Sequence, residues 1–186
     1  MKLLLIISTM FFLQACSHTQ EKPIPLAEKV DLNRFMGDWY VVANIPTFIE
    51  EGAHNAIESY AMNEDGSIAT TFTFNQDSFD GELKIYKPTG FVSEHNNSQW
   101  GMQFIWPIKA EFLIAYLSDD YQHTIIARSA RDYLWVMSRS PDIDDALYQS
   151  LVQRSVDMGY AREQIQKVPH KQSSINNPAA IIREAK

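Results

Sequence analysis

The stretch Gly37-Asp38-Trp39-Tyr40-Val41-Val42-Ala43-Asn44-Ile45 decides the fold class, and it ends at Pro46. Valine, isoleucine and aromatic residues favour a pleated, half-buried strand. Successive side chains of a strand point to opposite faces. The residues that we expect on one apolar face are Trp39, Val41, Ala43 and Ile45. Such a face needs a second sheet, or closure of its own sheet into a barrel, to cover it.

More short β-rich segments follow, separated by turn residues such as Asp65-Gly66 and Asp80-Gly81. The predicted strands are 39–45, 56–62, 67–75, 83–86, 90–94, 99–106, 111–117, 123–128 and 133–139, with a short last strand within 164–168. Regular spacing and short loops favour antiparallel neighbours over crossovers through helices.

One segment has the pattern of a helix. Ser140-Pro141-Asp142 provides a cap, a proline for the first turn and an acidic residue for the positive end of the helix dipole. Ile143, Leu147 and Leu151 then recur at helical spacing, and Gly159 ends the pattern. The sequence therefore predicts a single helix after the last long strand.

Two further strands carry large apolar groups on one face. The first has Trp100, Met102, Phe104 and Trp106 on that face. The second has Tyr133, Trp135 and Met137, with Leu134 and Val136 opposite them and available to pack under the helix. This pattern fits a filled sandwich core. It fits equally an eight-stranded barrel, which is wide enough to hold one small ligand. Methionine and aromatic residues suit a pocket for a flexible apolar guest.

Three motifs, in order and at suitable spacing, resemble those of the lipocalin family. Gly37-Asp38-Trp39-Tyr40, after Phe35-Met36, resembles the G-x-W-Y motif at the start of the first strand. Asp119-Asp120-Tyr121 resembles the acidic-tyrosine turn between two later strands. The segment from Tyr133 to Arg139 resembles the last barrel strand, with its terminal arginine. The resemblance covers about residues 33–169, and the bacterial lipoprotein branch, related to apolipoprotein D, is the most similar.

The resemblance implies an all-β fold. This fold is an eight-stranded up-and-down antiparallel β-barrel, or calyx, with one C-terminal α-helix packed on its outside. Trp39 would plug the closed end and Arg139 would stack on it. The structural residues that the motifs imply at this end are Gly37, Trp39, Tyr40, Asp119, Asp120, Tyr121 and Arg139. Loops 46–55, 76–80, 107–110 and 129–132 would frame the open mouth.

The resemblance also implies a small hydrophobic ligand, for which we expect a fatty acid or a lysophospholipid. The expected wall residues are Val41, Ala43, Trp100, Met102, Phe104, Trp135 and Met137. The cations expected to meet a carboxylate or phosphate at the mouth are Lys109 and Arg131, with Lys84 and Lys87 as further candidates. Two indoles on one strand, those of Trp100 and Trp106, could also fill the barrel. The alternative is therefore a ligand-free envelope lipoprotein with a structural or stress-related role.

The N-terminal residues suggest export and a lipid anchor. Lys2 precedes an apolar stretch, 3–13, that is too short to span a membrane as a helix. Leu13-Gln14-Ala15-Cys16 then resembles a bacterial lipobox, which implies that residues 1–15 are a signal peptide and that Cys16 carries the lipid. Because serine rather than aspartate follows Cys16, we expect the outer membrane, with the domain facing the periplasm.

These observations predict the organisation of the chain. Residues 16–33 would be an acylated N-terminus with a flexible spacer, 34–170 the barrel and its helix, and 171–186 a disordered tail. Cys16 is the only cysteine, so an intramolecular disulfide is impossible. The oligomeric state, monomer or homodimer, stays open.

Composition weighs against other classes of function. The formal net charge is −7 and no basic cluster occurs, so a nucleic-acid partner has no electrostatic basis. The lipid would occupy the only thiol, no G-x-S-x-G motif occurs, and the histidines lack metal-ligand spacing. We therefore expect no enzyme activity, no catalytic residue, no metal and no cofactor.

Overall fold

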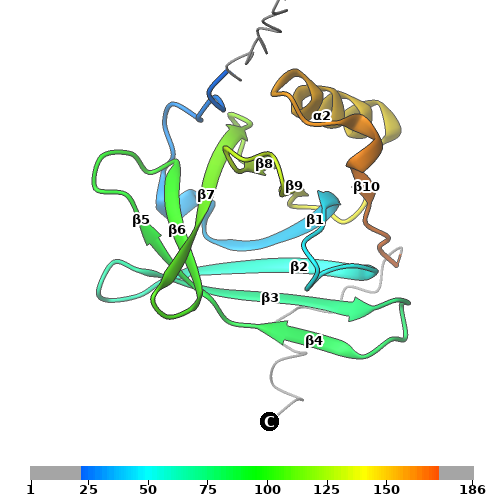
Figure 1. Ribbon diagram of the computed structural model, residues 1–186, viewed down its shortest axis with the longest axis horizontal. Coiled ribbons are helices and arrows are strands. Elements are labelled where there is room, and N and C mark those ends of the chain that lie inside the picture. The colour runs from blue at the N-terminus through cyan, green and yellow to red at the C-terminus, as the bar shows by residue number, and fades with distance from the viewer. Residues whose placement is uncertain (1–21, 172–186) are drawn as a thin grey trace, which may run out of the picture.

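The computed structural model describes residues 22–171, which form a closed antiparallel barrel of eight strands with two extra strands (Figure 1). The barrel strands are β1 (Gly37–Ile45), β2 (Ala53–Met62), β3 (Ile68–Gln76), β5 (Thr89–Val92), β6 (Gln99–Ile105), β7 (Ile108–Leu117), β8 (His123–Ala127) and β9 (Leu134–Ser138). Pairing of β1 with β9 closes the ring. The extra strands are β4 (Leu83–Tyr86), which pairs with β3, and β10 (Gln166–Lys167), which pairs with β1. The predicted fold class is confirmed.

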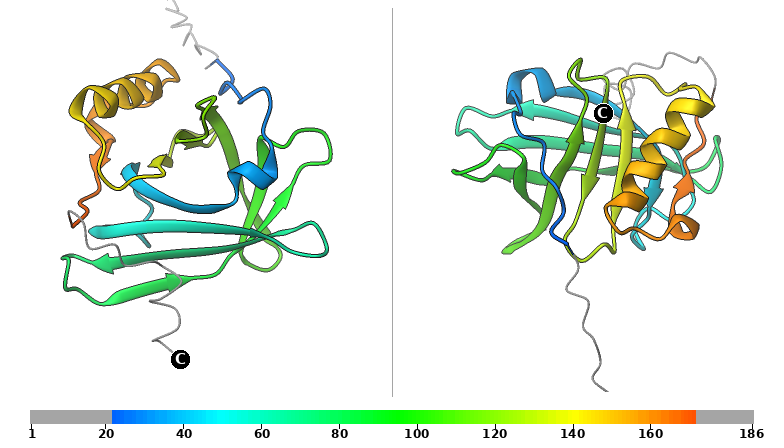
Figure 2. Two further views of the ribbon diagram at one scale, coloured as in Figure 1. Left: turned by 180° about the vertical axis from the view of Figure 1, so that it is seen from behind. Right: turned by 90° about the horizontal axis from the view of Figure 1, so that it is seen from above.

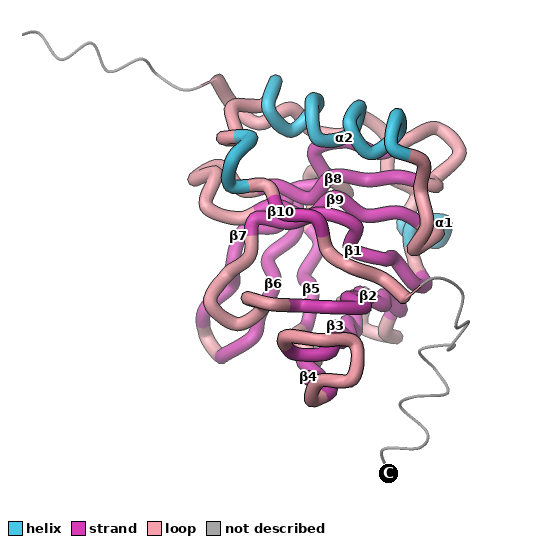
Figure 3. Tube along the Cα trace, turned by 90° about the vertical axis from the view of Figure 1, so that its right-hand side faces the viewer, coloured by secondary structure: helices cyan, strands magenta, loops and turns pink. Residues whose placement is uncertain are grey.

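The main helix, α2 (Asp145–Asp157), packs on the outside of the barrel, above β8, β9 and β10 in Figure 3. Its N-cap is Asp144, whose carboxylate accepts a hydrogen bond of 2.7 Å from the backbone N–H of Leu147. The predicted start at Ser140 is therefore too early, because the local capping bond forms four residues later. Two short helices, α1 (Leu32–Phe35) and a 3₁₀ turn (Arg162–Gln164), have no counterpart in the prediction.

Two hydrophobic clusters divide the buried side chains. One fills the barrel and the other lies between the outer wall and α2. Leu134 and Val136 belong to the outer cluster with Leu151, as the alternation along β9 predicts, whereas Trp135 and Met137 belong to the inner one.

An irregularity in β1 changes the alternation on which the sequence analysis depends. Val41 pairs with Met137 and Ala43 pairs with Val136, so β1 gains one residue at this bulge. Trp39 and Val41 belong to the inner cluster, but Ala43 and Ile45 belong to the outer one. The inward orientation predicted for Ala43 and Ile45 is therefore wrong.

Residues 22–33 lie along the barrel wall, although the sequence analysis assigns them to a flexible spacer. Ile24 and Val30 are buried, and the backbone N–H of Ala27 donates to the Ile114 carbonyl over 2.9 Å. The right-hand view of Figure 2 shows this blue segment running along the barrel to α1. Its few apolar side chains anchor it despite its polar, proline-containing sequence. The predicted signal peptide, Cys16 and almost all of the predicted tail lie outside the described residues.

Candidate ligand-binding site

One end of the barrel is closed by Trp39 and Arg139. The Trp39 side chain is fully buried, and its indole N–H donates to the Phe35 carbonyl over 2.9 Å. The Arg139 guanidinium lies 3.8 Å from the centre of the Trp39 ring. It also donates to the carbonyls of Asp38 at 2.7 Å and Met36 at 2.9 Å. Burial lowers the pKa of Arg139 to about 10, so the group keeps its charge at neutral pH. A charge-assisted stack thus seals this end.

The other motif residues surround the same end. Gly37 has a φ of +93°, a conformation that favours glycine. The Tyr121 hydroxyl accepts a hydrogen bond of 2.8 Å from the Asp31 backbone N–H, which ties the β7–β8 loop to the start of α1. Asp119 contributes its backbone carbonyl to Arg34, and the Asp120 carboxylate accepts from Ser118 within the turn. None of these residues lines the cavity described below.

Aromatic rings fill the closed half of the barrel. Trp100 stacks on Phe112 with ring centres 5.1 Å apart, and it meets Phe35 and Tyr60 edge-on at 5.5 Å each. Trp100 therefore faces the interior as predicted, but it serves as packing. Trp106 lies in the β6–β7 turn and is 81% exposed, so it does not narrow the barrel.

The open half contains a cavity of about 210 Å³. Its walls are apolar and come from the β1–β2 loop and from β3, β6, β7 and β9. The lining residues are Thr47, Phe48, Ile49, Glu50, Phe72, Met102, Phe104, Ala110, Glu111, Phe112, Arg128, Tyr133 and Trp135. The cavity exceeds an engineered apolar cavity of about 150 Å³ that binds benzene, but it lies below the ~300–1,000 Å³ of typical ligand pockets.

The predicted wall residues separate into three groups. Met102, Phe104 and Trp135 line the cavity. Val41, Trp100 and Met137 face the interior without lining it. Ala43 lies outside the barrel wall because of the bulge in β1.

Glu50 is a buried carboxylate in the cavity wall that the sequence analysis missed. Its Oε2 accepts a hydrogen bond of 2.6 Å from the Trp135 indole N–H, and its Oε1 accepts from the Thr47 hydroxyl over 3.1 Å. Burial raises the pKa of Glu50, while these hydrogen bonds act in the opposite direction. Glu50 thereby fixes the orientation of the Trp135 ring beside the cavity.

A second carboxyl group, that of Glu58, is buried inside the barrel without a hydrogen-bond partner among the described residues. Burial, and secondly the charge of Glu50, raise the pKa of Glu58 well above its usual range, so the group is protonated more readily. The Tyr60 hydroxyl also lacks a partner within residues 22–171. Ala56, Glu58 and Tyr60 alternate along β2, so the sequence could have placed Glu58 on the inward face; the sequence analysis did not consider this pattern.

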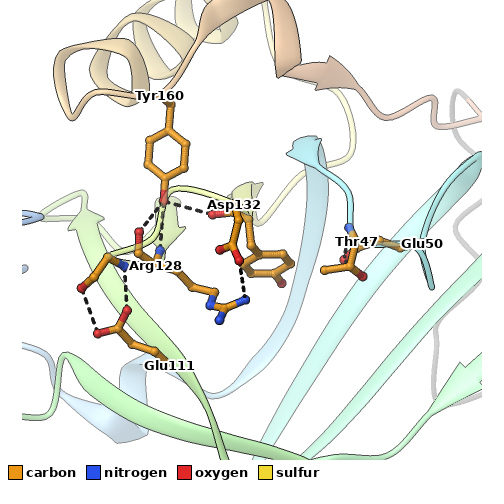
Figure 4. A network of polar contacts seen from close by, with 8 residues as sticks. Thr47, Glu50, Glu111, Arg128, Asp132 and Tyr160 are labelled. Atoms are coloured by element: carbon orange, nitrogen blue, oxygen red, sulfur yellow. Dashed lines mark hydrogen bonds and ion pairs between the residues drawn. The ribbon is translucent and has the colours of Figure 1, made fainter.

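Arg128 is the cation at the cavity, and the sequence analysis missed it as well. Figure 4 shows its side chain reaching toward Asp132, with an N···O distance of 3.3 Å between the two. Tyr160 holds the Arg128 backbone from outside, because its hydroxyl accepts from the Arg128 N–H over 2.9 Å. The Arg128 Nε is buried and has no hydrogen-bond partner in the described part of the chain. This donor is an unsatisfied polar group in a residue of the cavity wall.

The two cations that the sequence predicts at the mouth, Lys109 and Arg131, lie near that end, but their side chains do not line the cavity. Lys109 points outward, with its Nζ 3.5 Å from the centre of the Phe91 ring. Lys109 and Ala110 are neighbours in β7, so their side chains point to opposite faces, and Ala110 lines the cavity. The Arg131 guanidinium donates to the carbonyls of Met158 at 2.8 Å and Lys22 at 2.5 Å, outside the barrel. Neither side chain therefore lines the cavity, Lys109 because of its place in the alternation of β7 and Arg131 because of its hydrogen bonds to backbone carbonyls.

Within residues 22–171, no group of three or more histidine, cysteine, aspartate or glutamate side chains could hold a metal ion. No helix within residues 22–171 is long and apolar enough to cross a membrane.

An eight-stranded barrel with one sealed end and an apolar cavity at the other defines a calyx. The model of the lipocalin-like domain family matches residues 30–170, and the chain belongs to that family. It is 24% identical to temperature-induced lipocalin-1 of Arabidopsis thaliana over 161 residues, covering 81% of this chain and 85% of that protein. It is 25% identical to outer membrane lipoprotein Blc of Escherichia coli K12 over 155 residues, with the same coverage of 81% and 85%.

Among solved structures, insecticyanin from the tobacco hornworm Manduca sexta has a similar fold. The TM-score is 0.63 at 12% sequence identity, over 81% of this chain and 86% of that one. This similarity supports the shared barrel architecture.

Proposed function

We propose that this protein is a membrane-anchored carrier that binds, stores or transports amphipathic lipids, with fatty acids or lysophospholipids as ligands. The observation that carries the proposal is the apolar cavity at the open end, with the unpartnered Arg128 Nε–H in its wall. An alkyl tail would lie in the cavity and a carboxylate or phosphate would stay at the mouth.

The tail gains free energy by leaving water. Each buried methylene contributes about 0.8 kcal/mol, before the cost of ordering the chain. A cavity of about 210 Å³ limits how much of a long chain can be enclosed. Met102 in its wall is unbranched and adaptable. We therefore expect medium-length tails to bind without rearrangement and longer tails to extend past Phe104, which is 48% exposed at the rim.

The headgroup would meet Arg128. A guanidinium forms short, charge-assisted hydrogen bonds to carboxylate or phosphate oxygens. Asp132 holds one end of this guanidinium at 3.3 Å, and the Nε–H has no hydrogen-bond partner among the described residues. Lipids without an acidic headgroup would lose this contact and bind more weakly.

The anchor would be the lipid on Cys16, in the outer membrane and facing the periplasm. The support is the lipobox in the sequence and the similarity to a protein named outer membrane lipoprotein Blc. A single acyl chain binds a membrane only weakly and reversibly, whereas two chains anchor a protein stably, as a diacylglyceryl group on Cys16 would.

The carrier would act without chemical turnover. The Ser129 hydroxyl donates to the Glu111 carboxylate over 2.9 Å, and no histidine is among the residues that line the cavity. Steady hydrolysis of a chromogenic ester by the purified protein, lost on substitution of a single residue, would contradict this part of the proposal.

A fluorescence titration tests ligand binding. Trp135 lines the cavity, so its emission should change saturably as decanoic acid, palmitic acid or lysophosphatidylethanolamine is added at micromolar concentration. The Trp135→Phe variant should bind but lose most of the signal. No saturable change with any of the three ligands would favour the ligand-free, filled barrel.

A pair of alanine variants tests where the ligand binds. Ala110→Phe places a ring in the cavity and should weaken binding at least 10-fold. Ala69→Phe makes the same change on β3 at an exposed position and should leave affinity unchanged. Equal affinities for the two variants would mean that the ligand lies elsewhere.

Cys16→Ser tests the anchor. The variant should fold normally but appear in the soluble fraction after cell breakage. Continued association with membranes after a high-salt wash would contradict lipid attachment at Cys16.

A further inference from the structure

The mouth of the barrel carries an apolar patch on its outer surface. Seven large hydrophobic side chains are exposed in the part of the chain that the structure describes, and five of them lie on the β1–β2 loop or the β6–β7 hairpin. We call these five the mouth patch: Phe48 at 87% exposure, Phe104 at 48%, Ile105 at 73%, Trp106 at 81% and Ile108 at 68%. Their combined exposed area is on the order of 600 Å², at the upper limit for a monomer surface. Such a patch indicates an interaction site.

The patch is continuous with the cavity. Phe48 and Phe104 belong both to the patch and to the cavity lining. Ile105, Trp106 and Ile108 extend the same apolar surface to the tip of the hairpin. An alkyl chain at the tip could therefore reach the cavity without crossing water.

The N-terminal segment leaves the barrel at this same end. The Lys22 carbonyl accepts from Arg131, which lies in the β8–β9 loop, and that loop is flanked by the cavity residues Arg128 and Tyr133. At its other end the segment is fixed by the bond from the Asp31 N–H to the Tyr121 hydroxyl at the closed end. The segment thus runs from the mouth to the closed end, and it is not a free spacer.

This path restricts where the anchor can be. Only residues 17–21 separate Cys16 from Lys22, so the chain between these two residues reaches at most about 20 Å. With acyl chains on Cys16, the mouth must lie within that distance of the bilayer. Residues 99–110 also contain Lys109 but no aspartate or glutamate, although the whole chain has a net charge of −7. The hairpin therefore brings no acidic side chain that an anionic lipid surface would repel.

From these observations we infer that the mouth patch docks on the lipid bilayer, with Ile105, Trp106 and Ile108 inserted among the headgroups. Tryptophan at a protruding tip suits this interface, where one side of the ring is apolar and the other polar. The patch would then cover the passage of a lipid from the bilayer to the cavity. That the mouth faces the bilayer rests on the proposed lipid anchor at Cys16. Insertion of the hairpin tip does not require the anchor.

A chain of residues 17–186, which lacks both the apolar leader and Cys16, allows the tip to be tested without the anchor. Vesicles of phosphatidylethanolamine and phosphatidylglycerol, 3:1, are mixed with the protein and separated by flotation. Trp106 is the only strongly exposed tryptophan of the four, since Trp39, Trp100 and Trp135 are buried. We expect its emission to shift to the blue on vesicle binding and to be quenched by brominated lipids. Trp106→Phe should keep binding but lose the shift.

Matched isoleucine variants locate the contact. Ile105→Ser should lower the bound fraction at least 5-fold, whereas Ile85→Ser, at an exposed position on β4 outside the patch, should leave it unchanged. Both variants should bind decanoic acid in solution like the parent protein, because neither residue lines the cavity. Equal vesicle binding by the two variants would overturn the inference.

Two further outcomes separate this inference from its alternatives. If sedimentation shows a dimer that Ile105→Ser dissociates, while the parent does not bind vesicles, the patch joins two copies of the chain and the inference is wrong. If vesicle binding depends on Ile105 but no ligand changes the emission of Trp135, the inference stands and the proposed carrier function fails.

Discussion

The two ends of the barrel are built from the same alternating strands but are filled differently. At the closed end, Trp39 and the aromatic rings around Trp100 occupy the axis, and Arg139 seals them. At the open end, a cavity of about 210 Å³ is lined by residues of the β1–β2 loop and of the strands, Ala110 among them. The same hydrophobic pattern therefore gives a packed core at one end and a cavity at the other.

The largest effect should come from the closed end. Trp39→Ala should lower the free energy of unfolding by about 3–5 kcal/mol, as loss of a buried aromatic ring does. Its counterpart at the open end, Phe48→Ala, should change stability by less than about 0.5 kcal/mol, because Phe48 is 87% exposed. Urea denaturation measures both. Similar losses for the two variants would remove the distinction between a packed end and an open end.

Two arginines provide a second contrast. Arg139→Met should cost about 2–4 kcal/mol of stability, because the carbonyls that it caps lose charged donors. Arg128→Met should change stability by less than about 1 kcal/mol, since its ion pair with Asp132 is partly exposed. The same variant should weaken decanoate binding about 5- to 10-fold, or roughly 1–1.4 kcal/mol. Denaturation and fluorescence titration of both variants measure these effects. A larger stability loss for Arg128→Met, or a larger affinity loss for Arg139→Met, would contradict the assignment of the two ends.

Glu58 allows a smaller, pH-dependent test between the two halves. Glu58→Leu should raise the free energy of unfolding at pH 7 by about 1–3 kcal/mol, because it removes a buried group without a partner. Burial raises the pKa of Glu58, so the parent loses stability as pH rises above about 4.5, where the carboxyl ionises only in the unfolded chain. The gain should therefore be larger at pH 8 than at pH 4.

The control for this test is Glu50→Leu, in which four hydrogen-bond donors would lose their acceptor, so stability should fall. His170 is half-buried, and desolvation lowers its pKa, which reduces stability at acid pH, but it does so equally in parent and variants. A gain from Glu58→Leu that does not vary with pH would mean that Glu58 does not titrate differently on folding.

The closed end could be predicted from sequence because its geometry depends on local motifs. The resemblance of three ordered motifs to the lipocalin family implies that Trp39, Arg139 and the turn at Asp119-Asp120-Tyr121 lie together at one end. The observed stack of 3.8 Å between Arg139 and Trp39 agrees with that expectation.

The open end could not be predicted to the same extent. One extra residue at the bulge in β1 turns Ala43 outward, and no residue in that stretch marks the bulge. Lys109 and Arg131 have the right charge and position in sequence, but their side chains bind Phe91 and two backbone carbonyls outside the barrel. Long-range packing also holds residues 22–33 on the barrel wall, although their composition alone predicts a flexible linker.

Methyl-labelled methionine offers the most direct measurement of the central claim, that the open half admits an alkyl chain. Met102 lines the cavity, and Met62 is exposed at the end of β2 outside it. With decanoic acid bound, the account predicts nuclear Overhauser contacts between the alkyl protons and the Met102 methyl group, and none to that of Met62. Saturating ligand with no contact to Met102 would contradict it.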